Sequence, residues 1–170
     1  MLDSYYMAMS WKELLVGTSW QRTLARGFAM ALVTGIIFTQ IFIPVSLQGE
    51  SMEPTYRDGS WLLVNRWTYS FKKQQLADVV AIRLAGPSVL FFKRIVGLPG
   101  DEISWQKGTL YRNGKPVEEP YVTLGCNWHS EPVKVGKGQV YVVGDNRSSA
   151  KEQHSHGIID DYRLVGGPLW

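Results

Sequence analysis

A serine, a lysine and an Asp-Asn pair stand in three short segments whose residue types suit nucleophilic chemistry. The first segment is Gly49-Glu50-Ser51-Met52-Glu53-Pro54-Thr55, and the turn signal Asp58-Gly59 follows it. Pro54 and that turn predict a loop rather than a helix. A loop serine can present its hydroxyl beside backbone N–H groups that form an oxyanion hole. Serine is a poor nucleophile until a base removes its proton, so Ser51 needs a partner.

The second segment, Phe91-Phe92-Lys93-Arg94-Ile95-Val96-Gly97-Leu98-Pro99-Gly100-Asp101, offers Lys93 as that base. In a strand, Lys93 shares its face with Phe91 and Ile95, whereas Arg94 points to the opposite face. Burial disfavours the charged amine and lowers its pKa from about 10.4. A fall of about 3 units, worth roughly 4 kcal/mol, would make Lys93 a usable base near neutral pH. The structural alternative is a strand-end lysine that reaches water.

The third segment is Gly144-Asp145-Asn146-Arg147, followed by Ser148 and Ser149. By itself it is typical of a turn, just as an isolated loop serine is typical of a solvated turn. The information therefore lies in the order and spacing of the three segments, and in the elements that would hold them.

An uncharged apolar run precedes all three segments and covers residues 28–45. As a helix it would be about 27 Å long, near the lower limit for crossing a bilayer. Basic residues precede the run and none follows it until Arg57, which predicts a cytoplasmic N-terminal segment at 1–27 and a far-side location beyond residue 45. A cleaved secretory signal and a buried core helix are the alternatives.

After the apolar run, strand-length runs alternate with turn signals, which is typical of antiparallel β structure. The runs cover residues 61–64, 78–84, 89–96, 110–111 and 139–143. Asn113-Gly114 predicts a hairpin turn between two of the strands. We therefore predict a mainly β domain over residues 46–170, preceded by one transmembrane helix over residues 28–45.

Composition excludes several other classes of protein. The 170 residues have a net charge of +3 but no long basic run, so we predict no nucleic-acid partner. Cys126 is the only cysteine and cannot form an internal disulfide. One cysteine with scattered histidines is not a zinc pattern, so we predict no metal and no cofactor.

Together the segments resemble the type I signal peptidases, the Ser/Lys proteases that remove signal peptides from exported proteins. The resemblance covers residues 28–167. Its specific parts are Ser51-Met52-x-Pro54-Thr55 directly after the apolar run, the ungapped lysine box from Lys93 to Asp101, and Gly144-Asp145-Asn146-Arg147.

The resemblance implies antiparallel sheets coiled around the site, as in signal peptidases and LexA. It implies Ser51 as nucleophile, Lys93 as general base, and a substrate cleft that includes Gly49 and Met52, with the Ser51 N–H donating to the oxyanion. Substrates would carry small residues at the first and third positions before the cut, commonly Ala-x-Ala, selected by shallow apolar pockets. They would run extended and pair with a strand edge. The supporting residues that we predict are Arg94, Asp145, Asn146 and Ser149.

The chain departs from the family pattern at two places. Many bacterial members have Ser-Gly-Ser-Met, and here Gly49-Glu50 precede Ser51, so the first serine's hydroxyl is missing from the oxyanion hole. The last box usually continues as Ser-x-Asp-Ser-Arg, and the matching residues here are Ala150, Glu152, Gln153 and His154. The family serine hydrogen-bonds the lysine amine, which Ala150 cannot do; Ser148 and Ser149 are the hydroxyls left nearby. A Glu152–His154 pair would depend on pH near about 6.5.

Related peptidases of the endoplasmic reticulum have histidine at the position of Lys93. The lysine therefore implies a bacterial or organellar protein. We expect a single-pass protein of the bacterial plasma membrane with its catalytic domain outside the cytoplasm. Its partners would be preproteins with signal peptides and membrane lipid. The oligomeric state is not predicted.

Three other functions fit parts of the pattern. A specialised peptidase for conjugative pilins or similar precursors would explain the altered last box. A self-cleaving regulator of the LexA type also uses Ser and Lys, but such proteins are soluble. A catalytically dead, membrane-anchored binding protein is suggested by Ala150 and opposed by the presence of both Ser51 and Lys93.

Overall fold

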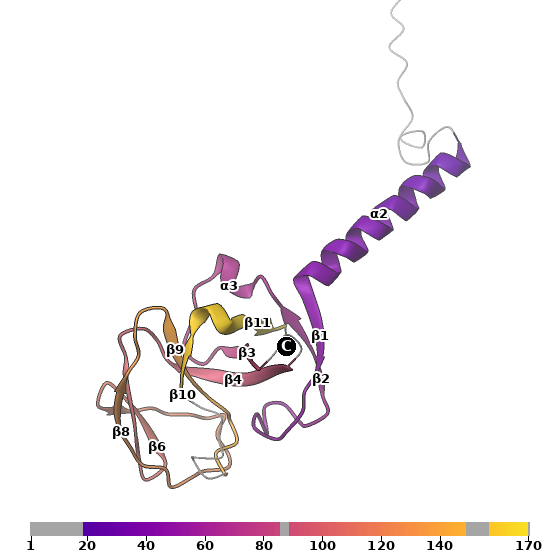
Figure 1. Cartoon of the computed structure of the whole chain (residues 1–170). Coiled ribbons are helices and arrows are strands. Elements are labelled where there is room, and N and C mark those ends of the chain that lie inside the picture. Colours follow the sequence, from indigo (N-terminus) through magenta and orange to yellow (C-terminus); the bar gives the residue numbers. More distant parts are fainter. Residues whose placement is uncertain (1–18, 86–88, 149–156, 170) are drawn as a thin grey trace, which may run out of the picture. The chain divides into compact units, whose positions relative to one another are not determined.

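The computed structural model describes residues 19–85, 89–148 and 157–169 (Figure 1). The chain divides into two compact units, one up to Gln40 and one from Ile41 onward. The N-terminal unit contains helix α2 (Trp20–Ile41), whose side chains are almost all exposed. Its length and apolar composition are sufficient to cross a membrane.

Helix α2 differs from the predicted span of residues 28–45 at both ends. It begins at Trp20, because arginines at a helix end can extend their long side chains toward the headgroups and need not end the span. It ends at Ile41, and β1 (Phe42–Ser46) follows instead of more helix. Pro44 explains this end: it disfavours a helix and is tolerated in an edge strand, which β1 is.

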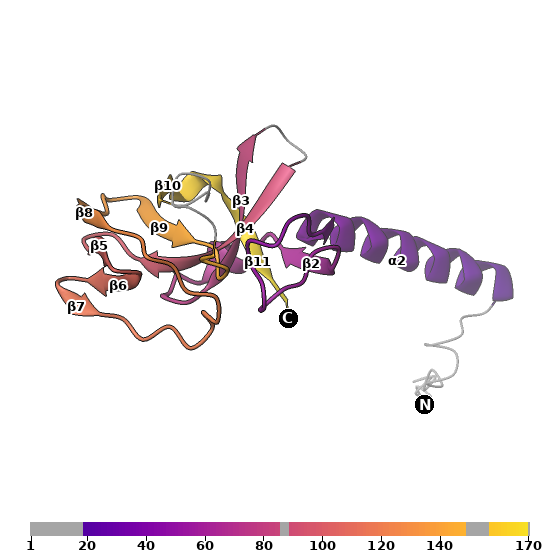
Figure 2. The same ribbon diagram turned by 90° about the horizontal axis from the view of Figure 1, so that it is seen from below.

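The second unit consists mainly of two antiparallel sheets, which confirms the predicted mainly β class. The larger sheet has the order β1-β2-β11-β3-β4-β9-β10, and the smaller has the order β7-β6-β5-β8. Figure 2 shows the strands of the smaller sheet together, at the end of the unit away from β2. Besides β1, the larger sheet contains β2 (Trp61–Asn65), β3 (Val79–Ala85), β4 (Val89–Gly97), β9 (Gln139–Val143), β10 (Gly157–Asp160) and β11 (Leu164–Pro168). The smaller contains β5 (Glu102–Gln106), β6 (Thr109–Arg112), β7 (Lys115–Pro116) and β8 (Ser130–Lys134).

Two one-turn helices complete the unit, α3 (Thr68–Phe71) and the 3-10 turn η2 (Asp161–Arg163). The hairpin predicted at Asn113-Gly114 is confirmed, since β6 pairs with β7 across these two residues. Both have positive φ, 54° and 74°, as a two-residue type I′ turn requires.

Three clusters of buried apolar side chains form the core of the second unit. One lies against the smaller sheet and includes Trp105 and Trp128, whose rings meet edge to face at 5.1 Å. Another, which includes Met52 and Phe92, joins the loop after β1 to β4. The third is formed by aliphatic residues of β3, β4 and β9. Strand β4 contributes to all three clusters, so its position is fixed from several sides.

Candidate active site

Ser51 lies in a loop that is closed at its base by backbone hydrogen bonds. The Leu47 N–H donates to the Ser60 carbonyl, and the Gly59 N–H donates to the Leu47 carbonyl, at 2.8 and 3.0 Å. The Gly49 N–H donates to the Asp58 carboxylate at 2.7 Å. Gly49 has φ +93°, which glycine adopts without strain. The structure thus confirms the loop predicted for this segment.

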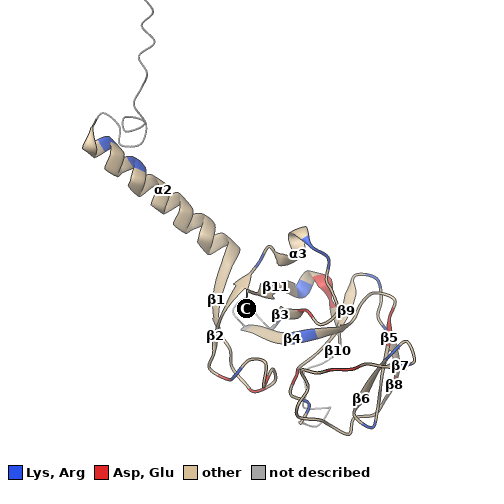
Figure 3. Ribbon diagram, turned by 180° about the vertical axis from the view of Figure 1, so that it is seen from behind, with Lys and Arg blue, Asp and Glu red and all other residues tan. Residues whose placement is uncertain are grey.

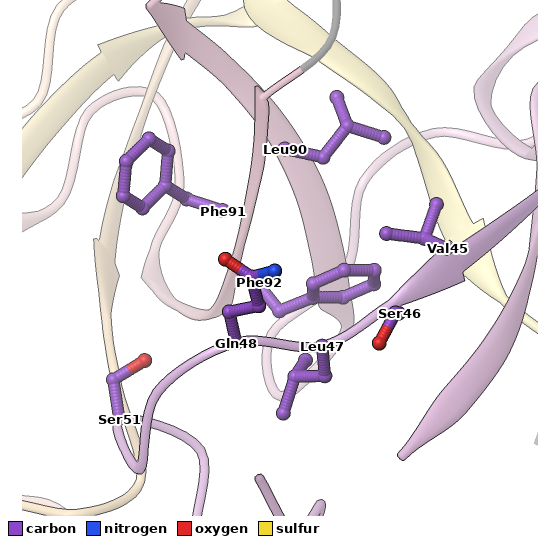
Figure 4. A pocket seen from close by; sticks show the side chains of 8 residues that line it. All are labelled: Val45, Ser46, Leu47, Gln48, Ser51, Leu90, Phe91 and Phe92. Atoms are coloured by element: carbon purple, nitrogen blue, oxygen red, sulfur yellow. The ribbon is translucent and has the colours of Figure 1, made fainter. Parts of the chain in front are cut away.

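The Ser51 side chain borders a cavity of about 470 Å³ between this loop and strand β4. In Figure 4 the hydroxyl of Ser51 lies on the cavity side of its loop. Most of the wall is apolar, and Gln48 adds an amide to it. The cavity is lined by Val45, Ser46, Leu47, Gln48, Ser51, Leu90, Phe91 and Phe92.

Lys93 lies in the middle of β4, opposite Val80 of β3, with only 3% of its surface exposed. Its neighbours Phe92 and Ile95 are core residues. Burial lowers the pKa of Lys93 to about 8, and the Asp145 carboxylate offsets part of this shift. A neutral amine is therefore accessible in mildly alkaline solution, which an exposed lysine does not offer.

Arg94, the next residue, forms a buried ion pair with Asp145. Its Nε and Nη2 donate to the two carboxylate oxygens at 2.8 and 2.6 Å, so the pair is bidentate. Nη1 donates to the Ala77 carbonyl at 2.8 Å, and the guanidinium stacks 4.0 Å from the centre of the Tyr121 ring. The Thr55 hydroxyl also donates to Asp145, which ties the end of the serine loop to the same carboxylate.

Asn146 binds the backbone of the serine loop at two points. Its N–H donates to the Ser51 carbonyl at 3.1 Å, and its side-chain amide donates to the Glu50 carbonyl at 3.2 Å. Its own Oδ1 accepts from the N–H and the hydroxyl of Ser148. The third segment thus contacts the first through Asn146, and contacts the strand of Lys93 through Asp145.

Arg147 and Glu119 form a second buried ion pair that the sequence did not indicate. Arg147 is 1% exposed, and its two terminal nitrogens donate to the Glu119 carboxylate at 2.7 and 3.2 Å. The Tyr121 hydroxyl donates to the same carboxylate at 2.9 Å. Because the partners lie 28 residues apart, only the folded chain reveals the pairing.

The remaining predicted site residues do not line the cavity or lie outside the described part of the chain. Met52 is fully buried in the cluster that contains Leu47 and Phe92, so it supports the cavity wall from behind. Among the predicted site residues that the structure describes, only Ser51 lines the cavity. Ser149, and the departures at Ala150, Glu152, Gln153 and His154, lie outside the described residues.

Within the described ranges, the His, Cys, Asp and Glu side chains form no group of three that could hold a metal ion. The chemical groups that the site does offer are a loop hydroxyl at a cavity, a buried amine with a lowered pKa, and backbone amides around the loop. This set suits acyl transfer by a serine nucleophile.

The chain belongs to the signal peptidase family, peptidase S26, whose family model matches residues 20–168. It is 35% identical to signal peptidase I of Bacillus amyloliquefaciens, over 86% of this chain and 80% of that protein. It is 31% identical to signal peptidase IB of Staphylococcus aureus (strain Mu50 / ATCC 700699), over 91% and 87%. A signal peptidase I structure from Enterococcus faecalis V583 covers 56% of this chain and 97% of its own, with 25% identity and a TM-score of 0.45.

These comparisons confirm the resemblance to type I signal peptidases that the motifs indicated. They assign the chain to the serine peptidases. The apolar N-terminal helix and the bacterial relatives also identify a membrane-anchored protein.

Proposed function

We propose that this chain is a membrane-anchored endopeptidase that removes signal peptides from exported preproteins, with Ser51 as nucleophile and Lys93 as general base. The observation that carries the proposal is the convergence of the three segments. Asn146 holds the loop of Ser51, and Asp145 holds the residue next to Lys93. Family membership then supplies the reaction class and the substrate class.

In the proposed reaction, neutral Lys93 takes the proton from Ser51 as the hydroxyl oxygen attacks the scissile carbonyl carbon. The C–N bond then breaks, the protonated Lys93 returns the proton to the leaving amine, and an ester to Ser51 remains. Lys93 next removes a proton from water as the water oxygen attacks the ester carbon. The bond to the Ser51 oxygen then breaks, Lys93 returns the proton to that oxygen, and the signal peptide leaves as a carboxylic acid. The lowered pKa of Lys93 supports this role, because a base must be unprotonated to act.

The oxyanion would be held by the backbone N–H of Ser51. Among the described residues this N–H donates to no other group, whereas the Ser51 carbonyl is already engaged by Asn146. The hydrogen bond from Asn146 to the Ser51 carbonyl fixes the orientation of the loop before the substrate binds. Such preorganised donors stabilise charge that develops in the transition state.

The substrate would lie extended between two strand edges on either side of the cavity. On one side, β1 is the edge strand of its sheet. On the other, β4 pairs with β9 only from Arg94 onward, so its earlier residues up to Lys93 have a ladder partner only in β3. A peptide between these edges can form main-chain hydrogen bonds, while the apolar wall receives its small side chains.

The proposed location is a bacterial plasma membrane, with residues 1–27 in the cytoplasm and the β domain on the opposite side. The basic residues Arg22 and Arg26, at the start of the apolar helix, support this orientation. Preproteins emerge from the membrane on that side, where their cleavage sites become accessible.

The proposal is tested by incubating the full chain in detergent with a preprotein that carries an Ala-x-Ala site. The matched control is the same preprotein with phenylalanine at the last position before the cut. We expect cleavage after Ala-x-Ala and none in the control, because the larger ring clashes with a shallow pocket. An inert chain would refute the proposed removal of signal peptides from exported preproteins, and cleavage of a pilin-type precursor alone would establish the specialised peptidase instead.

A further inference from the structure

The segment between β7 and β8 contributes two side chains that contact both buried arginines of the site. The Tyr121 hydroxyl donates to the Glu119 carboxylate at 2.9 Å, and Arg147 donates to the same carboxylate at 2.7 and 3.2 Å. The Cζ atom of Arg94 lies 4.0 Å from the centre of the Tyr121 ring. Glu119 and Tyr121 therefore connect Arg94 with Arg147, and the two residues are called here the Glu119–Tyr121 bridge.

The guanidinium of Arg94 is held along its edges by hydrogen bonds and over its face by Tyr121. Bidentate pairing with Asp145 and the bond to the Ala77 carbonyl hold the edges. The ring over the face adds a cation–π contact and limits tilting of the guanidinium out of its plane. Lys93 and Arg94 form the blue segment of β4 in Figure 3, so the side chain that Tyr121 holds belongs to the residue next to Lys93.

Arg147 in turn holds the segment that carries Asp145 and Asn146. Its Nε donates to the Gly144 carbonyl at 2.5 Å, and its backbone N–H donates to the Leu124 carbonyl at 3.2 Å. The side chain of Arg147 thus bonds back across the two residues that separate it from Gly144. These are the two residues that contact β4 and the serine loop.

The Glu119–Tyr121 bridge is a buried and charged unit with defined geometry. Burial raises the pKa of Tyr121 and the charge of Glu119 raises it further, so the hydroxyl keeps its proton and remains a donor. The side chain of Glu119 is 9% exposed, so water and salt screen its pairing with Arg147 only weakly. A rigid unit of this kind suits positioning, because an error of about an ångström at reacting groups lowers the rate strongly.

We propose that the Glu119–Tyr121 bridge positions the two reacting groups relative to each other. Through Arg94 it holds Lys93 on β4, and through Arg147 it holds the segment that binds the serine loop. The inference rests on the proposed function and gives the β7–β8 connection of the smaller sheet a part in it. Glu119 and Tyr121 are positioning residues: within the described ranges neither lines the cavity, so they should affect the chemical step more than substrate binding.

The test compares three variants of the full chain in detergent, each shown to be folded by its unfolding transition. Tyr121→Leu removes the ring from Arg94. Tyr121→Phe keeps the ring and loses only the donor to Glu119, and Glu119→Gln loses the charge that pairs with Arg147. The matched controls are Tyr111→Leu and Tyr111→Phe, at a half-buried tyrosine on β6.

With an Ala-x-Ala preprotein, Tyr121→Leu and Glu119→Gln should lower kcat by about 10 to 100-fold and leave KM within about twofold. Tyr121→Phe should recover most of the rate, because the ring still covers Arg94. In an Arg94→Lys chain, which keeps the charge but lacks the planar group, Tyr121→Leu should cost little more. A loss in KM alone, an equal loss in the Tyr111 controls, or full additivity with Arg94→Lys would overturn the proposal.

A titration that needs no substrate keeps the inference separate from the proposed function. The pKa of Lys93 is followed by NMR on the chain labelled with 13C-lysine, and Lys93→Met assigns the signal. In Tyr121→Leu this pKa should rise by about 0.5 or more, because a displaced Arg94 neutralises less of the Asp145 charge that favours the charged amine. If the chain cleaves no precursor but shows this rise, only the proposed function is refuted. A folded Tyr121→Leu chain with an unaltered Lys93 pKa would overturn the positioning role, whatever its cleavage rate.

Discussion

Lys93 is subject to opposite requirements from folding and from catalysis. In the folded chain its pKa is lowered from 10.5 to about 8, so below pH 8 a charged amine is buried. Below both pKa values the amine is charged in the folded and in the unfolded chain, so burial of the charge lowers the stability of the fold. Between about pH 8 and pH 10.5 the folded form is neutral and the unfolded form charged, so stability rises with pH through this window.

We therefore predict that Lys93→Met stabilises the fold at neutral pH. The gain should be about 3.5 kcal/mol at most, from 1.4 kcal/mol for each pKa unit, and should vanish near pH 10.5. Urea unfolding in detergent at both pH values, with Lys72→Met as the exposed control, provides the measurement. A Lys93→Met variant that is less stable at neutral pH would mean that the amine is held by favourable contacts.

The same titration predicts how activity depends on pH. If neutral Lys93 is the base, kcat/KM should rise roughly tenfold per pH unit below the pKa and level off above about pH 8. A profile measured on a peptide without ionisable groups in this range isolates the contribution of the protein. A profile that is flat between pH 6 and 9 would exclude Lys93 as the titrating base.

Asn146 positions the serine loop, and its two donors can be separated. Asn146→Asp keeps the backbone N–H and the acceptor for Ser148, but loses the side-chain donor to the Glu50 carbonyl. We expect kcat to fall by about 10 to 100-fold with little change in KM, because a loop shift of about an ångström misaligns the attack. Asn146→Gln, which keeps the amide on a longer stem, should recover part of the rate. An equal loss in both variants would contradict a donor-specific role.

At the scale of elements, the Arg94–Asp145 pair joins β4 to the segment after β9. Asp145→Ala leaves a buried guanidinium unpaired and should reduce the free energy of unfolding by about 3–5 kcal/mol. Lys72→Ala breaks an ion pair that is largely open to solvent and should change stability by about 1 kcal/mol or less. Denaturant unfolding of both variants checks this contrast. Similar small losses would show that the Arg94 contacts to Ala77 and Tyr121 are sufficient alone.

Local sequence predicted the strands well because the signals of a strand are local. The runs at 61–64, 89–96 and 139–143 match β2, β4 and β9 closely, since apolar residues of strand type and flanking turn signals define each strand by its own residues. The end of the apolar helix was predicted less well. Hydropathy continues through Phe42–Val45, but Pro44 disfavours more helix and pairing with β2 makes those residues a strand.

At the scale of the whole molecule, the pairing of strands that lie far apart in the chain could not be predicted from the sequence. Strand β11 lies between β2 and β3, and it is placed there by packing over long sequence separations rather than by its own pattern. The Glu119–Arg147 pair and the bonds from Asn146 to the serine loop have the same origin. Motif order indicated that the three segments belong together, and the fold shows that Asp145 and Asn146 connect them.

The central claim is that Lys93 activates Ser51 in a signal-peptide-cleaving site. The most direct test is the single-turnover rate of cleavage of an Ala-x-Ala preprotein by the full chain, by Ser51→Ala and by Lys93→Met, each shown to be folded by its unfolding transition. Both variants should lose about 10³-fold or more of the rate, and the double variant should lose little beyond either one, because the two residues act as a unit. A Lys93→Met protein that cleaves at a rate close to that of the unchanged chain would contradict the account.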